Sequence, residues 1–293
     1  MLNHIDLSKA ILQPIETPFE KKVNLFMLRL DLLDEDISGN KWFKLKKNIE
    51  EAKRLCKKQI ITFGGAFSNH IAATAKACSI AGFDSIGIIR GEEIANHTLK
   101  KAALNGMKLR FVSRGLYRDK QQLLAWLAQE YNLDESLVIP EGGANAAGIE
   151  GCKEIVSLIN CTFNYIAVAC GTGTTLAGIM QQLNHNQKGL GISALKGGAF
   201  LYDEIINGIP KNKCQNLEII EQYHFGGYAK YSPELLIFIK DFYMKYNIKL
   251  DFIYTAKLMF GLFDLIQQNY FPENATIIAI HSGGLQGNEG IGI

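Results

Sequence analysis

The stretch Ser-Gly-Asn-Lys-Trp-Phe-Lys-Leu-Lys-Lys at residues 38–47 predicts a turn followed directly by a helix. Ser38 and Asn40 are cap-type residues and Gly39 is a breaker. Apolar residues then recur at the spacing of one helical face, at Trp42, Leu45, Ile49, Ala52 and Leu55. Lys41 is therefore expected in the first helical turn, where unpaired N–H groups and the helix dipole disfavour an ammonium. A partly buried Lys41 would be biased towards the free amine that a nucleophile needs.

The same segment also supports a simpler interpretation, in which Lys41 is one more surface charge. It carries seven further basic residues, namely Lys44, Lys46, Lys47, Lys53, Arg54, Lys57 and Lys58. Such charge runs usually form solvated helix faces, and taken alone the segment favours that interpretation. The rest of the chain has to decide between the two.

Composition excludes several classes of function. The 293 residues are 47% hydrophobic with a net charge of +2, so a large core is expected and no basic stripe suggests nucleic acid as a partner. No apolar run has membrane-spanning length, and the first residues do not resemble a secretory signal, which predicts a cytoplasmic protein. The six cysteines form no C-x-x-C pair and no histidine lies at metal-ligand spacing, so reduced thiols and no metal site are expected.

From residue 59 onward, short β-branched runs alternate with helical stretches. Strands are expected at 59–63, 85–89, 108–112, 137–139, 165–169, 189–194 and 276–280. Helices are expected at 70–80, 98–104, 119–130, 148–159, 176–183, 233–246 and 256–268. Apolar strands separated by helices predict an α/β fold with open, mostly parallel twisted sheets covered by helices on both faces. A boundary is expected near residues 144–150.

Three glycine-rich turns follow strands, where ligands bind in open α/β sheets. The first is Phe-Gly-Gly-Ala-Phe-Ser-Asn-His at 63–70. Gly64 and Gly65 allow a close approach of the backbone to a ligand, and Ser68 and Asn69 supply a hydroxyl and an amide. A plain N-cap at Ser68 or Asn69 would explain the same residues, and local sequence favours it.

The second turn is Cys-Gly-Thr-Gly-Thr-Thr at 170–175, between an apolar strand and a helix. Small residues leave backbone N–H groups free to converge on an anion, and three threonines add hydroxyls. No Lys-Ser/Thr follows the last glycine, so a nucleotide P-loop is excluded, and a phosphate site is favoured over a merely tight turn. The third turn, His-Ser-Gly-Gly at 281–284, places Ser282 at a strand end.

A helix-start lysine, a phosphate cradle without triphosphate machinery and the absence of metal ligands together suit pyridoxal 5′-phosphate. Residues 38–41, 64–70, 171–175, the Tyr254-Thr255 pair and residues 281–284 resemble, in order, the motifs of the 1-aminocyclopropane-1-carboxylate deaminase and D-cysteine desulfhydrase family. The resemblance covers nearly the whole chain. It implies the tryptophan-synthase β-like fold, with the cofactor in the cleft between a large domain (1–47 and 149–293) and a small one (48–148), and a homodimer.

The resemblance also implies roles for individual residues. Lys41 would bind the cofactor covalently and move the Cα proton, and Asn69 would hydrogen-bond the cofactor's ring oxygen. Ser68 would contact the substrate carboxylate or assist proton transfer. The remaining residues implied in cofactor or substrate binding are His70, Thr172, Gly173, Thr174, Thr175, Tyr231, Tyr254, Thr255 and Ser282. Tyr231 matches the family's tyrosine loosely, and Tyr228 is close enough to compete.

Position 255 bears on the choice between the two activities. A carboxylate facing the pyridine nitrogen strengthens the electron sink that cyclopropane opening requires, whereas a hydroxyl suffices for losing hydrosulfide. Thr255 and Ser282 resemble the desulfhydrase branch, which implies β-elimination from D-cysteine. The motif before Lys41 departs from the family pattern, as does Phe43. Alternatives are 1-aminocyclopropane-1-carboxylate deamination, another D-amino-acid lyase, or a non-catalytic pyridoxal-phosphate-binding protein.

Overall fold

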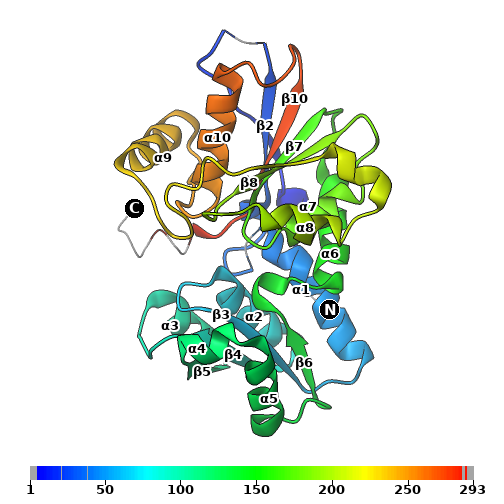
Figure 1. Cartoon of the computed structure of the whole chain (residues 1–293), viewed down its shortest axis with the longest axis vertical. Coiled ribbons are helices and arrows are strands. Elements are labelled where there is room, and N and C mark those ends of the chain that lie inside the picture. Colours follow the sequence, from blue (N-terminus) through cyan, green and yellow to red (C-terminus); the bar gives the residue numbers. More distant parts are fainter. Residues whose placement is uncertain (1–4, 21, 38, 286–287, 289–293) are drawn as a thin grey trace.

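The chain forms two open sheets, one above the other in Figure 1, with helices on both faces of each. The computed structural model describes residues 5–20, 22–37, 39–285 and 288, so Ser38 lies outside the described residues. The α/β fold class with two mostly parallel sheets is confirmed. Across the described residues, no helix is long and apolar enough to cross a membrane.

The larger sheet has six strands in the order β1-β2-β10-β7-β8-β9. Their bounds are Leu12–Pro14, Asn24–Arg29, Thr276–His281, Tyr165–Cys170, Lys188–Ser193 and Leu217–Ile220. Only β1 runs antiparallel to its neighbour. Every residue of β7 is buried, as expected of a central parallel strand covered on both faces.

The smaller sheet has four parallel strands in the order β5-β4-β3-β6. Their bounds are Met107–Val112, Asp84–Arg90, Gln59–Gly65 and Ser136–Ile139. The helices α2 (Asn69–Ala81) and α3 (His97–Leu104) pack on one face, and α5 (Lys120–Glu130) packs on the other. The short helix α4 (Arg114–Arg118) precedes α5.

Helices cover the larger sheet in the same way. α9 (Pro233–Tyr246) and α10 (Thr255–Gln267) share an apolar cluster with one face, while α6 (Ala146–Cys152), α7 (Thr174–Met180) and α8 (Phe200–Ile206) lie on the other side. The helix α1 (Asn40–Arg54) lies between the sheets in Figure 1. Its residues Phe43, Leu45 and Ile49 join a cluster that also includes Ile60 of β3 and Ile278 of β10. Lys41 is thereby held at the junction of the two sheets.

All seven expected strands are present, and three further strands were missed: β1, β2 and β9. β1 has only three residues, and a run this short does not reveal by periodicity whether it is strand or helix. β2 and β9 are as long as strands that were predicted, so length does not explain their omission. The helices α4 and α8 were also missed. The helix expected at 148–159 is wrong in its second half, because α6 ends at Cys152 and a 3-10 helix, Lys153–Leu158, follows. The strands of the small sheet lie within 48–148, but the proposed domain limits stay a prediction.

Candidate active site

A cavity of about 340 Å³ lies where the carboxyl ends of strands from both sheets meet. Turns and helix starts line it, from both sheets and from α1. Its polar lining comprises Asn40, Lys41, Lys44, Ser68, Asn69, His70, Arg90, Glu141, Thr172, Thr175, Tyr228, Tyr254 and Ser282. The volume is within the range of small-molecule sites.

Lys41 reaches this cavity from the first turn of α1. Gly39 precedes the helix with φ +64°, and the Asn40 N–H donates to the Ser282 carbonyl at 3.3 Å. The Lys41 Nζ donates to Asn40 Oδ1 at 2.7 Å, and Asn40 Nδ2 donates to Thr175 Oγ1 at 2.7 Å. Burial, together with the nearby Lys44 ammonium, lowers the pKa of Lys41 to about 7. A large share of Lys41 is therefore the free amine at neutral pH. This argues against the interpretation of Lys41 as one more surface charge.

Lys44 was missed as a site residue, because the lysines after Lys41 were expected to form a solvated face. It is 4% exposed, lines the cavity and donates to the Gly142 carbonyl at 3.0 Å. Burial lowers its pKa as well. The expectation was wrong here because residues three apart share a helix face, so Lys44 follows Lys41 inward. Lys46 and Lys47 instead form ion pairs with Glu154 and Glu50 and do not line the cavity.

The β3–α2 turn brings Ser68, Asn69 and His70 to the cavity. Ser68 accepts the Ile71 N–H at 3.4 Å, so it is an N-cap as well as a lining residue. Thr62 donates its hydroxyl to the Ile139 carbonyl, so His70 Nε2 donates to Thr62 Oγ1 at 2.9 Å. Burial lowers the pKa of His70 to about 3, which keeps the ring neutral with a bare Nδ1.

The β7–α7 turn forms one end of the cavity with Gly171, Thr172, Gly173 and Thr175. Gly173 has φ +71°, and a Cβ there would meet the Ile205 side chain. Thr172 and Thr174 hydroxyls lie 2.9 Å apart, but Thr174 is not a lining residue. Glycine backbone and threonine hydroxyls thus face the space beside Lys44, as a bound anion requires.

Two tyrosines also line the cavity, and one of them, Tyr254, packs against Gly171 of the β7–α7 turn. Tyr254 and Tyr228 line the cavity with ring centroids 6.1 Å apart. Burial raises the pKa of both phenols, so they are hydrogen-bond donors rather than bases. Tyr231 is exposed to a similar extent, 43% against 41% for Tyr228, but its ring centroid lies 5.3 Å from that of Phe252 and it does not line the cavity. Of the two competing tyrosines, the structure thus brings Tyr228 to Tyr254.

Thr255 and Ser282 occupy different positions relative to the cavity. Ser282 lines it, whereas Thr255 is fully buried and does not. The Thr255 hydroxyl donates to Asp251 Oδ2 at 2.6 Å and accepts the Asp251 N–H at 2.8 Å. The Asp251 carboxylate also accepts the N–H groups of residues 253, 254 and 255.

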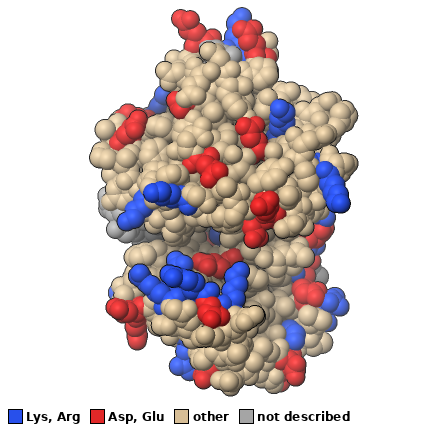
Figure 2. Space-filling view, in the orientation of Figure 1, with Lys and Arg blue, Asp and Glu red and all other residues tan. Residues whose placement is uncertain are grey.

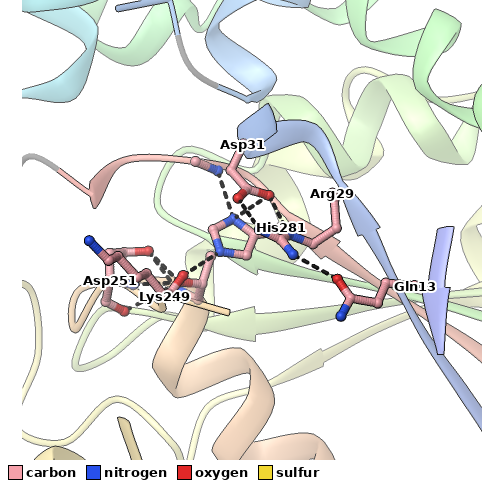
Figure 3. A network of polar contacts seen from close by, with 8 residues as sticks. Gln13, Arg29, Asp31, Lys249, Asp251 and His281 are labelled. Carbon is pink, nitrogen blue, oxygen red and sulfur yellow. Dashed lines mark hydrogen bonds and ion pairs between the residues drawn. The ribbon is translucent and has the colours of Figure 1, made fainter. Parts of the chain in front are cut away.

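A second buried network lies beneath Ser282 and is shown in Figure 3. His281 Nε2 donates to the Lys249 carbonyl at 2.7 Å, and Nδ1 lies 3.3 Å from Asp31. Arg29 holds Asp31 with two hydrogen bonds of 2.9 and 2.7 Å and donates to Gln13. These contacts fix the end of β10, from which Ser282 faces the cavity.

Comparison with known proteins identifies the family of this chain. The family model described as "Pyridoxal-phosphate dependent enzyme" matches residues 13–283. The chain belongs to this family. Pyridoxal phosphate is therefore its cofactor, and the resemblance inferred from the sequence motifs is confirmed.

Among relatives of this pyridoxal-phosphate enzyme, a putative 1-aminocyclopropane-1-carboxylate deaminase of Pyrococcus horikoshii is 30% identical, over 94% of this chain and 91% of that one. A bifunctional D-cysteine desulfhydrase/1-aminocyclopropane-1-carboxylate deaminase of Arabidopsis thaliana is 29% identical, over 90% and 73%. A D-cysteine desulfhydrase of Yersinia pestis is 27% identical, over 92% and 91%. A solved structure of an ACC deaminase homologue superposes with a TM-score of 0.78 at 28% identity, covering 96% and 93%.

The cavity of this pyridoxal-phosphate enzyme fits its cofactor on independent grounds. Asn69 Oδ1 and His70 Nδ1 are buried and have no partner among the described residues, although both side chains line the cavity. Such orphaned atoms are costly unless a ligand satisfies them. The turn at 171–175 and the Lys44 ammonium supply groups for a phosphate, and Lys41 supplies a free amine for an aldehyde.

Proposed function

We propose that this enzyme catalyses α,β-elimination on D-cysteine, giving pyruvate, ammonia and hydrogen sulfide. The observation that carries the choice is the residue type at two positions, Ser282, which lines the cavity, and Thr255, which does not line it but carries a hydroxyl where the resemblance implies a carboxylate for cyclopropane opening. Asp251, the carboxylate nearest to Thr255 in sequence, already accepts four hydrogen bonds. Glu141 is the one carboxylate among the lining residues in the described part of the chain, and Tyr117 donates to it.

Each of the residues that line the cavity has its own role in this reaction. Lys41, whose pKa near 7 leaves a free amine, would hold the aldehyde of the cofactor, and the same amine is placed to take the Cα proton of the substrate. When bound, pyridoxal phosphate withdraws electrons from that Cα. Ser68 binds the substrate carboxylate, and the Asn69 amide would hydrogen-bond the ring oxygen of the cofactor. Tyr254 and Tyr228 are hydrogen-bonded to each other, and the pair donates one hydrogen bond at the sulfur as the Cβ–S bond breaks. Residues 172–175, together with Lys44, hold the phosphate.

The elimination balances without an oxidant or reductant. D-cysteine loses its Cα proton and hydrosulfide, and one water then releases ammonia and leaves pyruvate. The purified enzyme should accordingly form sulfide and pyruvate from D-cysteine in a 1:1 ratio, which colorimetric sulfide detection and lactate dehydrogenase coupling measure. Parallel assays use L-cysteine and 1-aminocyclopropane-1-carboxylate. Turnover of L-cysteine alone, a larger kcat/KM for the cyclopropane, or bound cofactor with no turnover of any of them would each contradict the proposal.

Tyr228 and Tyr231 provide a matched pair for testing the substrate side. Tyr228→Phe should lower kcat/KM for D-cysteine roughly tenfold, because it removes a hydroxyl that faces the cavity. Tyr231→Phe should change it by less than about twofold, since the ring packs on Phe252 and the hydroxyl lies outside the cavity lining. Steady-state kinetics of both variants measures the contrast. The reverse ranking would return the substrate-side role to Tyr231.

A further inference from the structure

The cavity around Lys41 opens onto a second, wider space. Three residues, Arg90, Glu141 and Tyr228, line both the inner cavity and an outer groove of about 1500 Å³. Figure 2 shows the hollow between the two parts of the molecule, with Lys and Arg side chains gathered along its lower edge. D-cysteine has only a sulfur atom beyond Cβ, so the groove offers far more room than this substrate fills.

Arg90 stands at the passage between the two spaces as the last residue of β4. Its guanidinium carbon lies 5.4 Å from the centroid of the Tyr117 ring, a cation–π contact. The Tyr117 hydroxyl donates to Glu141 Oε2 at 2.9 Å, which fixes the ring on which Arg90 rests. The Tyr117 ring is therefore held at the place where the Arg90 guanidinium packs on it.

Apart from this contact with the Tyr117 ring, the charge of Arg90 is unpaired: no carboxylate of the described residues lies within ion-pair distance, although the side chain is exposed to the groove. The basic residues Arg114, Arg118 and Lys120 also line the groove, against Glu92, Glu93 and Glu141. Glu141 accepts the Tyr117 hydroxyl and keeps its negative charge, so the passage pairs one basic residue with one acidic residue. The guanidinium donors of Arg90 are nevertheless free for a ligand, because no described carboxylate engages them. A guanidinium of this kind suits a carboxylate, which it can bind through two parallel hydrogen bonds.

We propose that Arg90 forms a distal subsite and that the enzyme accepts amino acids whose β-substituent ends in a carboxylate. The subsite rests on the proposed elimination and extends it from hydrosulfide to longer leaving groups. The chemistry is unchanged: the Cα proton leaves, the Cβ–S bond breaks, and the thiolate carrying the carboxylate departs and takes a proton. Water then releases ammonia and pyruvate, as for D-cysteine.

Isosteric substrates test the subsite directly. S-carboxymethyl-D-cysteine and S-carbamoylmethyl-D-cysteine differ only in the charge of the terminal group. The wild-type holoenzyme should show a kcat/KM about tenfold higher for the carboxylate, and Arg90→Gln should bring this ratio close to one. Arg118→Gln is the matched control, because Arg118 lines the outer groove but not the passage, and it should keep the ratio within about twofold of wild type.

A binding measurement separates the subsite from turnover. D-2-aminoadipate has a methylene in place of the sulfur and cannot undergo the elimination. In calorimetric titrations of the holoenzyme its Kd should rise about tenfold in Arg90→Gln and stay within twofold in Arg118→Gln. Equal kcat/KM for the two wild-type substrates, or an Arg118→Gln variant that loses as much preference as Arg90→Gln, would overturn the assignment. D-cysteine turnover, measured alongside, reports on the proposed function separately, so a failed subsite with intact D-cysteine elimination leaves that function standing.

Discussion

Replacing Lys41 with alanine is expected to abolish the visible absorption band of the bound cofactor and to lower kcat/KM for D-cysteine by about 1000-fold or more. The reason is that one amine both attaches the aldehyde and takes the Cα proton. Lys41 has the lowered pKa of about 7 that this requires. Its Nζ donates a hydrogen bond to Asn40 Oδ1, and a rotation of the lysine side chain can break this bond. Absorbance spectra and steady-state kinetics of the purified variant measure the two losses.

Two controls make the result specific. Lys46→Ala removes a lysine of the same helix that pairs with Glu154 outside the cavity, and it should keep both band and activity. Lys44→Met removes the second cavity lysine, and the band should persist with weaker cofactor binding, because Lys44 is tied to the Gly142 carbonyl beside the phosphate turn. If Lys41→Ala kept the band and Lys44→Met lost it, the covalent residue would be Lys44.

The parts of the site that could be predicted are those carried by contiguous motifs. Residues 38–41, 64–70 and 171–175 each combine glycine with polar residues in sequence. The fold brings described residues of all three stretches to one cavity, namely residues 40–41, 68–70, 171–173 and 175. Lys44 could have been found as well, because a spacing of three places it on the face of Lys41. The composition of the lysine-rich segment concealed this signal.

Other site features depend on contacts between distant segments and have no local signal. Whether Tyr228 or Tyr231 meets Tyr254 is decided by the path of the loop between β9 and α9, which packs the Tyr231 ring on Phe252 of the segment between α9 and α10. The Thr255 hydroxyl donates its hydrogen to Asp251, so it can only accept a hydrogen bond from any further partner. Nothing in the sequence distinguishes Arg90 from any other residue at the end of a strand. Only its contact with the Tyr117 ring in the folded structure singles it out.

Gly39→Ala is expected to damage the site almost as severely as loss of the lysine, although it changes no catalytic group. Gly39 has φ +64°, and a Cβ at this position would overlap the Ser282 carbonyl oxygen. The same oxygen accepts the Asn40 N–H that holds the start of α1 against the end of β10. An alanine would therefore force these two segments apart and move Lys41 from its place. We expect the free energy of unfolding to fall by about 3 kcal/mol and cofactor affinity to fall by at least tenfold, measured by urea denaturation of the apoenzyme and by pyridoxal-phosphate titration.

Gly82→Ala is the control for a glycine with positive φ that has no neighbour to overlap. Gly82 caps α2 with φ +77° and ψ +32°, and beyond its chain neighbours no described atom lies within 4 Å of the position its Cβ would take. Alanine in this left-handed helical conformation costs about 1 kcal/mol. Gly39, with φ +64° and ψ −134°, lies outside that region, so the stability lost by Gly39→Ala beyond that of Gly82→Ala measures the contact with Ser282 together with the additional backbone strain, and only Gly39→Ala should weaken cofactor binding. Equal losses in both variants would mean that Gly39 serves the turn alone, and that the junction of α1 and β10 does not set the position of Lys41.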